Sequence, residues 1–147
     1  MNRKKFIALV LTVLLVIGVV LAGGYNTGKT ATMETPAPIV EDVSPREAAT
    51  LIENNRNNPD FIILDVRTPE EFADGHLANA VNIDFYAKTF RDELTKLDKS
   101  QTYLVYCRSG ARSLSSAQIM EGLNFKEVYN LSGGIIGWKA EGMPTIK

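Results

Sequence analysis

The chain has little of the chemistry that builds a disulfide framework or a metal site. Its 147 residues include one cysteine, Cys107, and one histidine, His76. A disulfide within the chain is therefore impossible. A zinc site is not expected either, because such sites need about three or four cysteine or histidine ligands. The sequence also lacks a glycine-rich nucleotide fingerprint. We therefore expect no metal and no cofactor.

An excess of charge of one sign is also missing. Lysine and arginine number 16 and aspartate and glutamate 17, which gives a formal net charge of -1. Hydrophobic residues make up 45% of the chain and charged residues 22%. These values exclude a disordered polymer, a collagen-like repeat and a strongly basic protein that binds nucleic acid. The length predicts a single folded domain.

The N-terminal part of the chain lacks charge over a long stretch. Basic residues at positions 3–5 are followed by no charged residue until Lys29, and residues 6–22 are apolar apart from one threonine and one glycine. This order is typical of an export signal, and its length lies between that of a cleaved signal peptide and that of a transmembrane anchor. We predict that residues 1–22 direct export across the cytoplasmic membrane. The rest of the chain would then be periplasmic or extracellular, or anchored through residues 6–22 if these are not cleaved.

The remainder of the chain divides into a linker and a domain. Residues 23–40 are rich in glycine, threonine and proline, which predicts a flexible linker. In residues 41–147, apolar runs of strand length alternate with segments that begin with helix-capping signals. This alternation predicts an α/β fold with a mainly parallel central sheet flanked by helices.

Local signals place the helices and strands. Ser44-Pro45 and Thr68-Pro69 each precede a glutamate at the capping-box position, which predicts two helix starts. The expected helices cover residues 45–55, 68–74, 90–97, 112–121 and 134–141, and the expected strands cover residues 61–64, 81–83, 102–106 and 127–130. On the fourth helix the expected apolar side carries Leu114, Ala117 and Met120, with Leu123 one turn further on.

Cys107 directly follows the expected strand 102–106 and precedes a helix. In open α/β sheets, ligands bind beyond the carboxyl ends of the strands. Gly110 permits a loop that aims several backbone N–H groups at the sulfur, and the helix adds the positive end of its dipole. Arg108 and Arg112 add formal positive charge, and all these features favour a thiolate. The sequence therefore predicts a reactive nucleophile rather than an inert buried cysteine.

The same loop resembles the active-site loop of rhodanese-type sulfurtransferases. The resemblance extends to further sequence segments, which occur in the same order as in the family and together span residues 41–147. It implies a rhodanese-like fold in which Cys107 is catalytic and the following six residues bind the substrate. The matching segments are Cys107, Arg108, Ser109, Gly110, Ala111, Arg112 and Ser113; residues 64–72; residues 75–77 with 82–83; and residues 131–134 with Trp138.

The resemblance also implies a mechanism. The Cys107 thiolate would take sulfur from a small anionic donor such as thiosulfate, or from a persulfide, and hold it as a persulfide. A thiol, cyanide or a protein would then accept the sulfur. Asp65 and Arg67 would support the loop, although a purely structural ion pair is favoured over a direct catalytic role. One departure is Ala78-Asn79, which stand where the family commonly has Pro-Gly.

Other chemically active residues are given structural roles. His76 could act as a general base for Cys107, but a structural hydrogen bond is favoured because no third orienting group is identifiable. Tyr103 and Tyr106 are expected to pack within the sheet rather than contact substrate. Residues 133–134 and Trp138 are expected to form a tight turn and pack a terminal helix.

Two alternative functions stay open. A cysteine phosphatase or arsenate reductase would need five residues between cysteine and arginine, whereas four separate Cys107 from Arg112. The shorter loop suits a single sulfur atom better than a tetrahedral oxyanion. The second alternative is an exported sulfur carrier or protein-interaction module with little turnover, and the intact Cys107 does not distinguish it from an enzyme.

Overall fold

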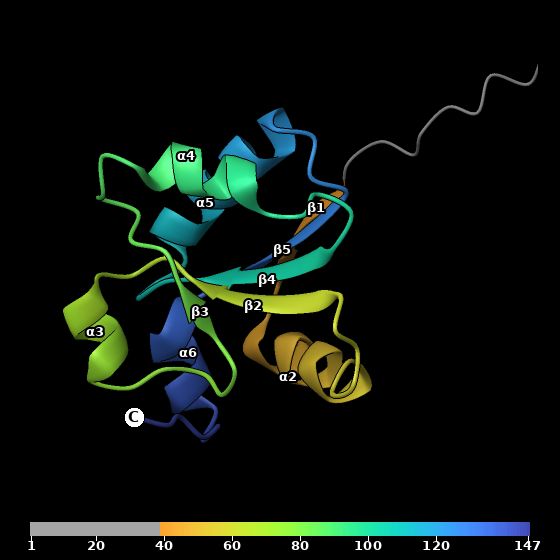
Figure 1. The fold of residues 1–147 in the computed structure, drawn as a ribbon. Coiled ribbons are helices and arrows are strands. Elements are labelled where there is room, and N and C mark those ends of the chain that lie inside the picture. The colour runs from red at the N-terminus through yellow and green to blue at the C-terminus, as the bar shows by residue number, and fades with distance from the viewer. Residues whose placement is uncertain (1–38) are drawn as a thin grey trace, which may run out of the picture. The chain divides into compact units, whose positions relative to one another are not determined.

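A parallel β-sheet of five strands forms the centre of the molecule. The computed structural model describes residues 39–147 (Figure 1), and the strand order is β1-β5-β4-β2-β3. Every strand pairing is parallel, which confirms the predicted α/β fold. The strands are β1 (Ile39–Val43), β2 (Phe61–Asp65), β3 (Val81–Asn82), β4 (Thr102–Tyr106) and β5 (Glu127–Leu131).

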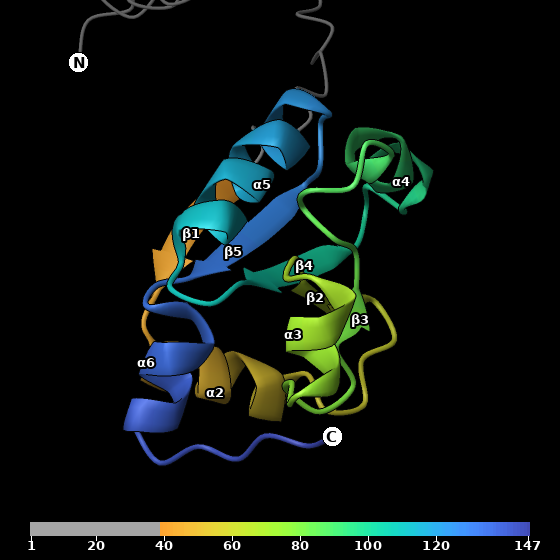
Figure 2. The same cartoon turned by 90° about the vertical axis from the view of Figure 1, so that its left-hand side faces the viewer.

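Helices cover both faces of this sheet. Figures 1 and 2 show α4 and α5 on one face and α2 and α6 on the other. The two predicted capping boxes are present, because Ser44 and Thr68 each accept from the backbone N–H of the glutamate three residues on. The helices are α2 (Pro45–Asn54), α3 (Pro69–Ala73), α4 (Phe90–Lys96), α5 (Ala111–Gly122) and α6 (Gly134–Ala140).

Strand β4 contributes to the core on both of its faces. Tyr103 and Val105 belong to the apolar cluster that includes residues of α4 and α5. Leu104 and Tyr106 belong to the cluster that includes residues of α2 and α6. Alternate side chains of a strand point to opposite faces, so a continuous apolar run is what a doubly covered strand requires. Both tyrosines are buried, and the prediction that they pack within the sheet is confirmed.

Two features differ from the sequence-based expectation. The strand β1 was not predicted, and its first two residues, Ile39 and Val40, fall at the end of the expected linker 23–40. Leu114, expected on the core side of α5, is exposed. Ser113 and Ser116 lie on the buried side instead, and their hydroxyl groups are satisfied by donating to backbone carbonyls one turn earlier.

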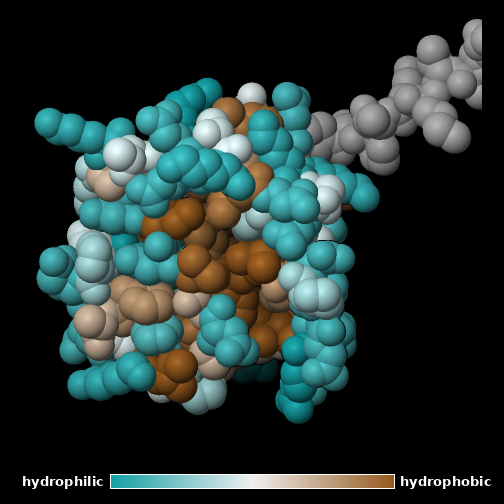
Figure 3. All heavy atoms as spheres, in the orientation of Figure 1, coloured by the Kyte–Doolittle hydropathy of each residue, from teal (hydrophilic) through white to brown (hydrophobic). Residues whose placement is uncertain are grey.

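One edge of the sheet is only partly covered. Strand β3 has two residues and pairs with β2 only at Leu64 and Asp65. Apolar side chains consequently gather near the centre of the face drawn in Figure 3. A groove along this edge is lined in part by Phe61, Ile62 and Val81.

The predicted export segment 1–22 and residues 23–38 of the predicted linker lie outside the described residues. Within residues 39–147, no helix has the length and apolar character that a membrane crossing requires.

Candidate active site

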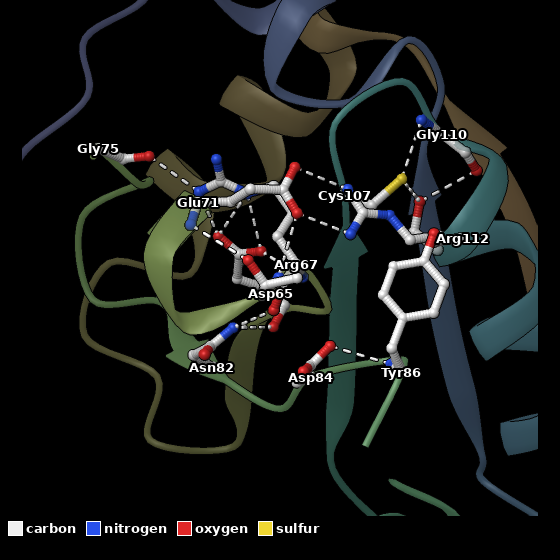
Figure 4. Close-up of polar contacts among 12 residues, drawn as sticks. Asp65, Arg67, Glu71, Gly75, Asn82, Asp84, Tyr86, Cys107, Gly110 and Arg112 are labelled. Atoms are coloured by element: carbon white, nitrogen blue, oxygen red, sulfur yellow. Dashed lines mark hydrogen bonds and ion pairs between the residues drawn. The ribbon is translucent and has the colours of Figure 1, made fainter. Parts of the chain in front are cut away.

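The sulfur of Cys107 lies inside the loop that joins β4 to α5. The residue is 1% exposed. Its Sγ accepts a hydrogen bond from the backbone N–H of Gly110 at 3.1 Å, and the Ser113 hydroxyl donates to it at 3.5 Å (Figure 4). Gly110 has φ of 99°, so the closed loop depends on glycine at this position. The predicted arrangement of N–H groups around the sulfur is therefore present.

These hydrogen bonds control the protonation of Cys107. Burial alone raises the pKa of the thiol, but the Ser113 hydroxyl and the backbone N–H groups of Ser113, Ser109 and Gly110 together outweigh it. The net result is a pKa below the ordinary cysteine value, which favours the thiolate nucleophile. Hydrogen bonds, more than the nearby arginines, therefore stabilise this thiolate.

Helix α6 fixes the backbone at Cys107 from the other side. The N–H of Ile135 donates to the Cys107 carbonyl at 2.9 Å, and the N–H of Ile136 donates to the Arg108 carbonyl at 3.1 Å. A Cβ on Gly134 would lie 2.5 Å from the Cys107 carbonyl oxygen, so only glycine allows this approach. The Gly133-Gly134 segment thus does more than form the expected turn, because it seats α6 directly on the catalytic loop.

Arg112 is held by a carboxylate from another helix. Its Nη1 and Nη2 atoms each lie 2.8 Å from an oxygen of Glu71 on α3. The hydrogen bond from Arg112 is the main reason that the pKa of Glu71 falls to about 2. The Tyr86 ring, which is 67% exposed, lies on the guanidinium at 5.4 Å from Arg112 Cζ to the ring centroid. In Figure 4 the Arg112 side chain extends from α5 towards Glu71, with Tyr86 beside it.

A pocket of about 430 Å³ opens over this loop. Four of the six predicted substrate-binding residues line it, whereas Gly110 and Ser113 are buried against the sulfur. The lining consists of Glu71, Tyr86, Arg108, Ser109, Ala111 and Arg112. A small anion could enter between the two arginines.

Asp65 and Arg67 form a second, buried ion pair. Arg67 Nη2 lies 2.6 Å from Asp65 Oδ2 and also donates to the Gly75 carbonyl at 2.8 Å. The Asn82 amide donates to the carbonyls of both Asp65 and Arg67. Arg67 Cζ lies 5.6 Å from the centroid of the Tyr106 ring. Within residues 39–147, neither side chain of the pair hydrogen-bonds to the loop 108–113. Arg67 instead lies against Tyr106, the residue before Cys107.

His76 makes the structural hydrogen bond that the sequence favoured. Its Nδ1 lies 3.0 Å from the Phe72 carbonyl oxygen, its ring stacks on Phe72 at 3.8 Å, and its backbone pairs with Ile146. The turn that follows uses Asn79 with φ of 63°, a left-handed conformation that asparagine tolerates and glycine favours. Within residues 39–147, no three or more His, Cys, Asp or Glu side chains form a group that could hold a metal ion.

Comparison with known proteins identifies the family. A sequence profile described as the rhodanese-like domain matches residues 44–141. The chain belongs to the rhodanese-like domain family. A sulfurtransferase of Allochromatium vinosum is 30% identical over 100 residues, covering 68% of this chain and 92% of the relative. The thiosulfate sulfurtransferase GlpE of Coxiella burnetii is 42% identical over 81 residues, covering 55% of this chain and 74% of the relative.

Solved rhodanese structures share the fold. A rhodanese-like domain protein of Staphylococcus aureus is 30% identical with a TM-score of 0.57, covering 73% of this chain and 98% of that one. A rhodanese-related protein of Thermoplasma volcanium is 27% identical with a TM-score of 0.60, covering 72% of this chain and 97% of that one. The predicted family, fold and enzyme class, a rhodanese-type sulfurtransferase, are thereby confirmed.

Two residues of this rhodanese site were not predicted to contribute to it. Glu71 was expected only as a capping residue, and it does accept from the Thr68 N–H. Its position follows from topology, because α3 comes directly after β2, and β2 neighbours β4 in the sheet. No pattern in the sequence indicates that Tyr86 reaches Arg112.

Proposed function

We propose that this rhodanese moves sulfane sulfur from thiosulfate or a persulfide to a thiophilic acceptor through a Cys107 persulfide. The observation that carries the proposal is the Cys107 sulfur, which is enclosed by the Gly110 N–H and the Ser113 hydroxyl beneath a pocket lined by two arginines. The relatives named sulfurtransferases support the same chemistry.

The reaction proceeds in two half-reactions. The Cys107 thiolate attacks the outer sulfur of thiosulfate, the S–S bond of the donor breaks, and sulfite leaves with the bonding electrons. The resulting persulfide anion then gives its terminal sulfur to an acceptor; cyanide becomes thiocyanate and the Cys107 thiolate is restored. No proton has to move, so neither step needs a general base such as His76. The N–H groups that stabilise the thiolate lie where they can also stabilise the persulfide anion.

The decisive experiment follows sulfur on the protein. The full chain is incubated with thiosulfate or with a small hydropersulfide, and its intact mass is measured before and after cyanide is added. We expect a gain of one sulfur atom, its loss to cyanide as thiocyanate, and ping-pong kinetics.

The matched control is Cys107→Ser, which is close to isosteric and should keep the fold while losing both the mass gain and the thiocyanate. Thiocyanate production by this variant would overturn the mechanism. A mass gain in the native chain without transfer to cyanide would favour a sulfur carrier that serves a specific protein acceptor.

For localisation, we propose that residues 1–22 direct export, with the basic N-terminus followed by the apolar stretch 6–22 as the supporting feature. A reporter fused to residues 1–40 should be recovered outside the cytoplasmic membrane. A reporter retained in the cytoplasm would refute export. N-terminal sequencing of the recovered protein decides between a cleaved signal peptide and an anchor.

A further inference from the structure

The two arginines at the pocket differ in how their charge is balanced. Arg112 has both terminal nitrogens on the Glu71 carboxylate. Arg108 is exposed and takes part in none of the ion pairs among residues 39–147. Because Glu71 also lines the pocket, the three side chains present one net positive charge there rather than two.

The negative charge of Glu71 is fixed in place. Its pKa of about 2 keeps the carboxylate ionised at neutral pH. The Thr68 N–H donates to the Oε2 atom of Glu71 at 3.2 Å, and the Tyr86 ring covers one face of the Arg112 guanidinium. An anion that enters the pocket therefore meets a held carboxylate beside the arginine that would otherwise attract it.

Such a carboxylate affects donors in proportion to their charge. Its repulsion of a dianion is about twice its repulsion of a monoanion at the same place. We propose that Glu71 is a specificity-determining residue that weakens the preference of this positively charged site for the thiosulfate dianion over sulfur donors with one negative charge, such as persulfide anions. This inference rests on the proposed sulfurtransferase function and names the substrate class of the same site.

A pair of donors that differ in one charge tests the proposal. Thiosulfate and methanethiosulfonate (CH3SO2S⁻) both transfer their outer sulfur to Cys107 when the S–S bond breaks, and they release sulfite and methanesulfinate, respectively. The charge is −2 for the first donor and −1 for the second. With cyanide as acceptor, kcat/KM for each donor reports the first half-reaction of a ping-pong enzyme.

The variant is Glu71→Gln, which removes the charge and keeps a residue that suits the capping box with Thr68. The control is Glu70→Gln, which removes a neighbouring exposed carboxylate of the same helix turn that is not bound to Arg112. For Glu71→Gln we expect kcat/KM to rise about tenfold for thiosulfate and about threefold for methanethiosulfonate. The ratio of the two constants should therefore rise about threefold, and it should stay unchanged in Glu70→Gln.

The ratio is measured on one sample, so partial unfolding of a variant does not alter it. An unchanged ratio in Glu71→Gln, or an equal rise in Glu70→Gln, would overturn the inference while leaving the sulfurtransferase function in place. Failure of the native chain to form a persulfide from either donor and also from a small hydropersulfide would instead refute the proposed function, and this inference with it.

Discussion

Two carboxylate–guanidinium pairs lie at the same end of the sheet, and they differ in burial and in partners. The side chains of Arg67 and Asp65 are 6% and 0% exposed, whereas those of Arg112 and Glu71 are 15% and 31% exposed. The inner pair also binds the Gly75 carbonyl. The outer pair lines the pocket over the catalytic loop.

The difference shows that burial decides what the same pair of groups can do. A buried pair cannot lose one partner without leaving a charge in a medium of low polarity. The Asp65–Arg67 pair is therefore suited to fixing the ends of β2, β3 and β4. The Arg112–Glu71 pair is partly exposed and lines the pocket, so an anion there can interact with both of its charges, and losing one partner costs less free energy.

The largest predicted effect is on stability, at the inner pair. Arg67→Ala leaves the Asp65 carboxylate buried without its partner and should lower the free energy of unfolding by about 3–5 kcal/mol. Denaturant unfolding followed by circular dichroism measures this. The free energy of unfolding should fall less in the double variant Asp65→Asn with Arg67→Met, because no unpaired buried charge remains. A single variant as stable as the native chain would show that the pair does not hold this end of the sheet.

The next effect is on activity, at the outer pair. Arg112→Ala removes a cation from the pocket and leaves the Glu71 charge uncompensated, so kcat/KM for thiosulfate should fall about tenfold or more. The free energy of unfolding should fall by less than about 1 kcal/mol, as for other partly exposed pairs. Steady-state kinetics and denaturant unfolding of one preparation test both statements. Unchanged donor kinetics would remove Arg112 from the substrate site.

The smallest effect is the acid response of the outer pair. The pKa of Glu71 is about 2 in the folded chain against an ordinary value of 4.5, so the unfolded chain binds the proton more readily. The pair's stabilisation is therefore complete above about pH 4.5 and is lost as the pH falls through about 2. Between about pH 4.5 and about pH 2, the free energy of unfolding of the native protein should fall by up to about 1 kcal/mol more than that of Glu71→Gln. Urea unfolding at several pH values measures this, and an equal fall in the free energy of unfolding of both proteins would contradict the pKa shift of Glu71.

Most of the fold could be predicted because its signals are local. The apolar runs of β2 and β4 and the capping residues Ser44 and Thr68 each determine structure within a few residues. Strand β1 gave no such signal, because it lies at the sheet edge with most of its side chains exposed. An exposed strand needs no apolar run.

In the candidate site, too, most contacts between residues close in the sequence were predictable and contacts between distant residues were not. The hydrogen bonds to the Cys107 sulfur come from residues within six positions of it. The sequence predicted the backbone N–H groups among them but not the Ser113 hydroxyl. The partner of Arg112 is 41 residues away and depends on how β2 and β4 are paired. The charge of the arginines was visible in the sequence, but the carboxylate that balances one of them depends on tertiary structure.

The docking of α6 on the catalytic loop has a consequence for the timing of biosynthesis. The N–H groups of Ile135 and Ile136 that bind the Cys107 and Arg108 carbonyls come from a segment synthesised after the loop itself. A nascent chain therefore carries Cys107 before the loop around it can be fixed. The residues whose hydrogen bonds lower the pKa of the Cys107 thiol are present before the helix that fixes their backbone, so the loop reaches its final form only when the C-terminal segment has been made.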